Sequence, residues 1–153
     1  MILSGAMVIM HPDMYCTSSK AMVKLGCWLE AKGQQDILSV LPIWASIYNV
    51  VLVVANRASP VHLDIKGRPQ WLDLLTTVGK YWDLDLTLPT IGLRLWYDPG
   101  TVVALSGQLI HHGVDAVGAN RGVVAFYMQD NMHEHLDVGR CNVMEVNRVP
   151  GSQ

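Results

Sequence analysis

The alternation of apolar and polar positions divides the chain into a helical first third and a strand-rich remainder. Over residues 20–32 the apolar side chains fall broadly on one side of a helix, with two serines before it as candidate caps and Gly33 as a stop. The apolar segment 36–48 contains Pro42, which fits either the first turn of a helix or a break. The pattern therefore predicts N-terminal helices on the outside of a sheet.

After residue 50, short runs of β-branched and aromatic residues replace the helical pattern, which is typical of strands. The expected strands are YNVVLVVA at 48–55, WLDLLTTV at 71–78, IGLRLWY at 91–97, TVVAL at 101–105 and GVVAFYM at 122–128. The expected turns are SP at 59–60, GRP at 67–69, DPG at 98–100, SG at 106–107 and VGAN at 117–120. The DPG turn between two apolar runs predicts a hairpin.

These elements predict an α+β chain whose main body is an antiparallel sandwich or barrel. A length of 153 residues, half of them apolar, suits a single domain. We expect a helical support layer over residues 1–49, a barrel core over residues 50–136 and a C-terminal tail over residues 137–153, whose last residues are frayed.

Composition narrows the classes of function. Eleven basic and thirteen acidic residues leave a net charge of −2, so any contact with nucleic acid must be local. The three cysteines are widely separated and predict neither a disulfide framework nor a thiolate zinc site, which suits a reducing compartment. The longest apolar run falls far short of the roughly 20 residues that cross a bilayer, so no membrane partner is expected.

One group of polar residues predicts a metal site. His62 and Asp64 lie two residues apart, so on a strand their side chains share one face, although such a pair alone is more often ordinary strand-end polarity. Downstream, LIHHGV offers His111 or His112 as a third ligand, and two histidines with one carboxylate are the ligand set of non-haem Fe(II) oxygenases. The guanidinium of Arg121 can grip the distal carboxylate of 2-oxoglutarate through two parallel hydrogen bonds.

Three longer segments carry a more specific pattern: NRASPVHLDIKGRPQWLDLLTTVGKY, LPTIGLRLWYDPGTVVALSGQLIHHGV and NRGVVAFYMQDNMHEHL. Together they resemble the catalytic core of the Tet/JBP group of 2-oxoglutarate- and Fe(II)-dependent dioxygenases, of the type found alongside transposons in mushroom-forming fungi. The resemblance runs from about Trp44 to Leu136. It implies a double-stranded β-helix, a jelly-roll or cupin-like barrel, that oxidises methyl groups on DNA bases, with 5-methylcytosine or N6-methyladenine as substrate.

Residue by residue, the resemblance implies His62, Asp64 and His112 as ligands of Fe(II). It favours the second histidine of the pair, although strand phase alone leaves His111 and His112 open. Arg121 is implied as the clamp for the cosubstrate 2-oxoglutarate, with O2 as the oxidant. Hydroxylation is then coupled to conversion of 2-oxoglutarate to succinate and carbon dioxide.

Two further residues are candidates for substrate contacts. Tyr127 shares the strand face of Arg121, six residues away, and is a candidate contact for a flipped-out base or the cosubstrate. A core aromatic with its hydroxyl at the rim is the competing interpretation. Asn56 ends a predicted strand shortly before His62 and is the second candidate.

The resemblance implies methylated DNA as the partner, with RNA as an alternative substrate. A nuclear location is expected from this substrate, and otherwise a cytoplasmic one. Few basic residues are available to bind DNA, because the net charge is negative and position 129 is Gln, where a basic residue could contact a phosphate or a base. The basic residues expected around the mouth are Arg57, Lys66, Arg68 and Lys80. Two alternatives stay open: the same chemistry on a small molecule or protein side chain, and a non-catalytic barrel that binds no iron.

The remaining histidines and tryptophans are expected to have no part in the chemistry. His11, His133 and His135 are expected to be solvated loop residues. Trp71, Trp82 and Trp96 are expected to be packing residues.

Overall fold

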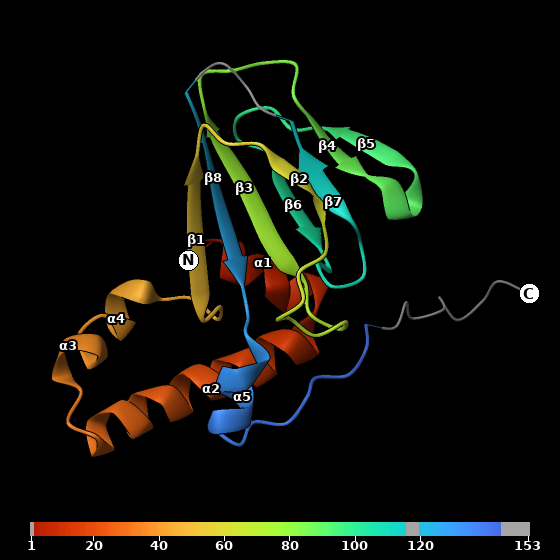
Figure 1. Cartoon of the computed structure of the whole chain (residues 1–153). Helices are drawn as coiled ribbons and strands as arrows, with labels where there is room; N and C mark the ends of the chain where they lie inside the picture. The colour runs from red at the N-terminus through yellow and green to blue at the C-terminus, as the bar shows by residue number, and fades with distance from the viewer. Residues whose placement is uncertain (1, 116–119, 145–153) are drawn as a thin grey trace, which may run out of the picture.

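Two four-stranded antiparallel sheets form the body of the computed structural model, which describes residues 2–115 and 120–144 (Figure 1). In spatial order, the first sheet contains β1 (Val50–Ala55), β8 (Arg121–Tyr127), β3 (Asp73–Gly79) and β6 (Val102–Leu105). The second contains β2 (Ser59–His62), β7 (His112–Val114), β4 (Asp85–Leu88) and β5 (Leu93–Trp96). Two facing sheets with helices outside match a double-stranded β-helix, so the predicted α+β fold class is confirmed.

The helices lie outside the two sheets, with α2 and α5 beneath one end of them (Figure 1). Met7 and Met14, from the first two helices, pack with Leu74 of β3 in one buried cluster, which Phe126 of β8 also contacts. Helices α1 and α2 therefore pack against one end of the outer face of the first sheet, while Val53 and Val78 on the same face are exposed. The helical elements are α1 (Ile2–Met10), α2 (Pro12–Ala31), α3 (Gln35–Leu38), α4 (Leu41–Trp44), the 3-10 turn η1 (Pro89–Ile91) and α5 (Asp130–His135). Over the described ranges, no helix combines the length and apolar character needed to cross a membrane.

A second buried cluster fills the space between the sheets. Leu86 and Val114 from the second sheet pack there with Leu105 from the first, and the partly buried Leu75 and Val123 join them. Because side chains alternate along a strand, β3 and β8 contact the helices with residues of one face, such as Leu74 and Phe126, and the barrel interior with residues of the other, such as Leu75 and Val123. The interior face is the one that reaches the candidate site.

Helix α2 begins at Pro12, well before the predicted start at residue 20. His11 caps it: the Met14 N–H donates to His11 Nδ1 over 3.4 Å, and His11 Nε2–H donates to the Gln70 carbonyl oxygen over 3.0 Å. Pro12 suits the first helical position because no intrahelical donor is needed there. The expectation that His11 is solvated is therefore wrong, since its side chain is buried and both ring nitrogens are used.

The DPG turn at 98–100 does not close a hairpin, contrary to the prediction. β5 pairs with β4 and β6 pairs with β3, so the turn carries the chain from the second sheet to the first. Gly100 supplies a φ of 92° at this turn, and its N–H donates to the Thr77 carbonyl oxygen over 2.7 Å. Turn residues specify a change of direction but not the sheet in which the next strand pairs.

Strands β2, β4 and β7 are not among the predicted runs. β2 includes Ser59 and Pro60, where a turn is expected, and the proline is tolerated because β2 is an edge strand. Pro42 lies in the first turn of α4, which is one of its two expected positions. Apart from Asn120, the predicted turn at 117–120 lies outside the described residues, as does the end of the predicted tail from residue 145 onward.

The tryptophans and C-terminal histidines only partly follow expectation. Trp71 is buried as expected, but Trp82 and Trp96 are 74% and 84% exposed and do not pack. His133 is 1% exposed, so the expectation of a solvated loop residue is wrong. It lies in α5 with its ring centroid 4.8 Å from that of Trp71. His135 is exposed but belongs to the same helix.

Burial of His133 should make the stability of the protein pH-dependent. Burial, together with the Arg68 charge, lowers the pKa of His133 from 6.5 to about 4. Between these pH values the unfolded chain binds a proton that the folded chain does not. The free energy of unfolding is therefore highest above about pH 6.5 and decreases as pH falls toward about 4. The full loss is about 3 kcal/mol at most. Urea denaturation at pH 7 and pH 5 should show that acid lowers the free energy of unfolding less in His133→Phe than in wild type. Equal decreases in the two proteins would contradict a role for His133.

Candidate metal centre

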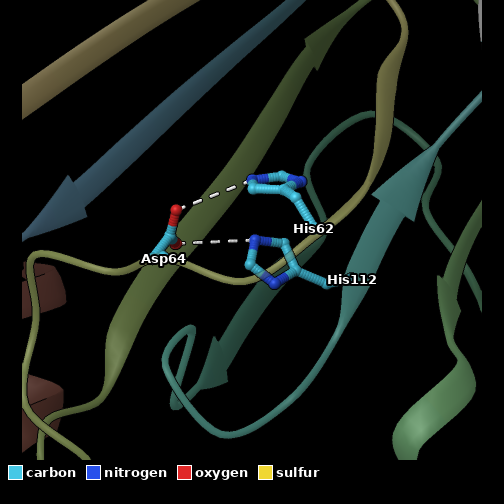
Figure 2. Close-up of side chains that lie close together, drawn as sticks. All are labelled: His62, Asp64 and His112. Carbon is cyan, nitrogen blue, oxygen red and sulfur yellow. Dashed lines mark ion pairs between the residues drawn. The ribbon is translucent and has the colours of Figure 1, made fainter.

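His62, Asp64 and His112 point toward one another beside the second sheet (Figure 2). β2 and β7 pair so that His62 lies directly opposite His112. One ligand atom from each of the three residues lies within 4.8 Å of the others, and each histidine Nε2 is 3.6 Å from an Asp64 carboxylate oxygen. Neighbouring ligand atoms around one ion with bonds of about 2.1 Å lie roughly 3 Å apart, so a small closure would seat a metal.

Hydrogen bonds to the backbone prepare both imidazoles for metal binding. His62 Nδ1 lies 2.7 Å from the Pro60 carbonyl oxygen, and His112 Nδ1 lies 2.9 Å from the Ile110 carbonyl oxygen. A carbonyl oxygen only accepts, so each Nδ1 carries the proton and each Nε2 presents its lone pair toward Asp64. Burial lowers the pKa of His112, against the effects of the Ile110 carbonyl and the Asp64 charge, and this favours the neutral form that binds metals.

Asp64 is held in the cluster by a loop hydrogen bond and not, as predicted, by sharing a strand face with His62. β2 ends at His62, so the two residues do not share a strand face. Instead, the Asp64 N–H donates to the Gly107 carbonyl oxygen over 2.9 Å, which ties Asp64 to the turn after β6. The Gly107 N–H donates in turn to Asp73 Oδ2 over 3.2 Å. The turn at Gly107 therefore links Asp64 to a second carboxylate.

That second carboxylate, Asp73, is not among the site residues predicted from the sequence. It is the first residue of β3, is buried, and lines the same cavity as the ligand cluster. Burial, followed by the Asp64 charge, raises the pKa of Asp73 to about 7, while the Gly107 N–H acts in the opposite direction. The one available signal is an acidic residue inside the apolar run WLDLLTTV, where burying a carboxylate is costly.

The two adjacent histidines have different surroundings. His111 is exposed; its N–H donates to Thr90 Oγ1 over 2.8 Å, and its Nδ1 lies 3.1 Å from the same oxygen. His112 is buried in the cluster with His62 and Asp64. The structure thus brings together the three residues that the resemblance implies and leaves His111 outside. Their role as ligands stays a prediction.

Arg121 is 4% exposed at the start of β8. Its backbone N–H donates to Asn56 Oδ1 over 2.7 Å, and Nη1–H donates to the Arg57 carbonyl oxygen over 3.1 Å. Among the residues that the structure describes, no carboxylate pairs with this guanidinium and Nε has no hydrogen-bond acceptor. A buried guanidinium without an anion is costly, so the arrangement suits a bound carboxylate.

A cavity of about 600 Å³ is lined by the ligand cluster and by Arg121. Tyr127 also lines it, as expected from the strand face that it shares with Arg121. Asn56 is not part of the lining: it has a φ of 50° and its side-chain oxygen accepts from the Arg121 N–H. The structure therefore places Asn56 as a support for Arg121 and does not bring it to the cavity.

The basic residues expected around the mouth do not all lie there. Arg57 and Lys66 line the cavity. Arg68 is buried and forms an ion pair with Asp130, so it is not available to a phosphate. Lys80 is not part of the lining. Positive charge at the cavity is therefore thinner than the sequence predicts.

Comparison with known families identifies a match over most of the chain. Residues 2–130 match Tet_JBP, described as the oxygenase domain of the 2OGFeDO superfamily. The match confirms the resemblance drawn from sequence motifs, and with it the enzyme class and the use of Fe(II), 2-oxoglutarate and O2. The donor set of two imidazoles and one carboxylate fits this metal. No curated protein matches the chain.

Proposed function

The chain belongs to the Tet/JBP family of 2-oxoglutarate- and Fe(II)-dependent oxygenases, and we propose that it hydroxylates methyl groups on nucleic-acid bases. The proposed reactions are oxidation of 5-methylcytosine to 5-hydroxymethylcytosine and beyond, or demethylation of N6-methyladenine. Methylated DNA is the proposed partner, with RNA as the alternative, and a nuclear location is proposed with it. The observation that supports this best is the convergence of His62, Asp64 and His112 on a cavity that also contains Arg121.

Each residue of the site has a distinct task in this proposal. His62 and His112 would hold Fe(II) through Nε2, because Nδ1 of each is engaged by a backbone carbonyl. Asp64 would supply the anionic ligand, and Arg121 would pair with the distal carboxylate of 2-oxoglutarate. The chemistry supplied by Fe(II), 2-oxoglutarate and O2 together is hydroxylation of a C–H bond, with succinate and carbon dioxide as coproducts.

The cavity offers groups that suit a flipped base. A base in a duplex must leave the stack before its methyl group can reach the ligand cluster. Tyr127 would provide a ring for stacking and a hydroxyl for an edge contact. Arg57 and Lys66, which line the same cavity, would meet the phosphates that flank the base.

Mass spectrometry of defined oligonucleotides tests the substrate. Duplexes and single strands that carry 5-methylcytosine or N6-methyladenine would be incubated with the protein, Fe(II), 2-oxoglutarate and O2, with succinate measured in parallel. We expect an oxidised or demethylated base with wild type and none with Asp64→Ala, since Asp64 is the anionic member of the cluster. Binding of the oligonucleotide should weaken as salt rises.

The same experiment distinguishes the main alternative. Succinate formation with no altered base would contradict a nucleic-acid substrate and favour a small molecule or a protein side chain. The net charge of −2 and the burial of Arg68 are the observations that favour this second candidate.

A further inference from the structure

The cavity contains a second buried hydrogen-bond donor that has no acceptor. Tyr97, the residue after β5, is 1% exposed and lines the cavity. Its hydroxyl has no hydrogen-bond partner within residues 2–115 and 120–144. Leaving a buried hydroxyl unsatisfied costs free energy, so an unpartnered donor in a functional cavity points to an acceptor on a bound molecule.

Arg121 lies against the same aromatic ring. Its guanidinium carbon is 5.8 Å from the Tyr97 ring centroid. Burial raises the pKa of Tyr97, with the Arg121 charge acting in the opposite direction, so the hydroxyl keeps its proton at neutral pH and can donate. A charged donor and the ring that carries a neutral donor are therefore neighbours in the cavity lining, and convergent donors of these two kinds recognise carboxylates.

The position of Tyr97 does not depend on its hydroxyl. The Tyr97 N–H donates to the Leu84 carbonyl oxygen over 2.7 Å, and the Tyr97 carbonyl oxygen accepts from the Tyr81 hydroxyl over 2.9 Å. The Tyr81 hydroxyl also bonds to the side chain of the buried Thr77. Backbone hydrogen bonds thus hold this residue in place, and within the described part of the chain, loss of the hydroxyl alone would break no hydrogen bond.

We propose that Tyr97 is a cosubstrate-binding residue whose hydroxyl donates a hydrogen bond to the same distal carboxylate of 2-oxoglutarate that pairs with Arg121. This rests on the proposed function, in which Arg121 is the clamp. A second donor at this end favours a 2-oxo acid with a second carboxylate over one without it, because a shorter acid would leave both buried donors unpaired.

Calorimetric titration of the Mn(II)-loaded full chain tests this role without turnover. The Kd for 2-oxoglutarate should rise about tenfold in Tyr97→Phe, as expected for one hydrogen bond to a charged acceptor. The Kd for Mn(II) should not change, and the thermal stability of the metal-free protein should be equal or slightly higher. 2-Oxobutanoate, which lacks the distal carboxylate, should bind wild type and Tyr97→Phe equally.

Tyr48→Phe is the matched control. Tyr48 is buried like Tyr97, but it lies outside the cavity lining and its hydroxyl donates to the Leu72 carbonyl oxygen over 3.1 Å. This variant should lose stability and keep the wild-type Kd for 2-oxoglutarate.

The outcomes separate the two proposals. An unchanged Kd for 2-oxoglutarate in Tyr97→Phe, with wild-type binding intact, would overturn the role of Tyr97 alone. Equal losses of affinity for 2-oxoglutarate and 2-oxobutanoate would also overturn it, because the effect would then lie at the metal end of the molecule. Failure of the wild-type protein to bind 2-oxoglutarate would overturn the function on which this inference rests.

Discussion

Replacement of His112 by alanine should abolish Fe(II)-dependent turnover, whereas replacement of His111 should leave it close to wild type. Only His112 lies opposite His62, with its Nε2 3.6 Å from Asp64. His111 is exposed and bonds to Thr90. Loss of a group that merely supports a metal ligand costs about 10–100-fold, so loss of the ligand itself should exceed about 100-fold.

Anaerobic titration of the metal-free protein with Fe(II) and 2-oxoglutarate measures this directly, through the visible metal-to-ligand charge-transfer band. We expect the band in wild type and in His111→Ala, and none in His112→Ala or Asp64→Ala. Circular dichroism of each variant checks that a lost band does not reflect unfolding. A full band and full activity in folded His112→Ala would overturn the choice of the third ligand.

Gly107→Ala should weaken Fe(II) binding by about 10–100-fold while the protein stays folded. A Cβ at residue 107 would lie 2.6 Å from Asp73 Oδ2 and would overlap the Asp64 carboxylate. Both groups are ends of flexible side chains, so they can move at little cost in stability, but Asp64 would then leave His62 and His112. Gly107 is not among the residues with positive φ, so its backbone conformation permits alanine.

Gly113→Ala is the contrasting variant. A Cβ there would lie 2.8 Å from the backbone nitrogen of Val61 and 2.9 Å from its Cα, so β2 and β7 would have to separate. We expect a loss of about 1–3 kcal/mol in the free energy of unfolding together with weaker metal binding. Urea denaturation and Fe(II) titration of both variants test the pair. Strong destabilisation by Gly107→Ala, or wild-type stability in Gly113→Ala, would contradict this account.

Local pattern predicts most of the first sheet, because its strands are runs of β-branched and other apolar residues. The predicted runs contain β1 and β6 entirely and nearly all of β3 and β8. Strand pairing is not a local property, as the DPG turn shows. The same residues would reverse the chain in a hairpin within one sheet or, as observed, between β5 of the second sheet and β6 of the first. Short strands such as β7, only three residues long, have too few positions to show a period.

The convergence of the candidate ligands could be predicted because histidines and a carboxylate in that order form a specific motif. The surroundings could not, since burial of a polar side chain is decided by tertiary contacts. Asp73, Tyr97 and His133 all lie in apolar or ordinary polar stretches of sequence, and only the folded chain shows that they are buried. Asn56 illustrates the converse: it is near the site in sequence, but its side chain supports Arg121 from outside the cavity.

The carbonyl groups that orient the two imidazoles belong to Pro60 and Ile110, each two residues before its histidine. Every amino acid carries such a carbonyl, so a substitution at either position changes a side chain and leaves the acceptor in place. The backbone conformation, and not the side chain at residue 60 or 110, thus determines the tautomer that presents Nε2. Substitution of residue 60 or residue 110 should therefore leave intact the tautomer that metal binding requires.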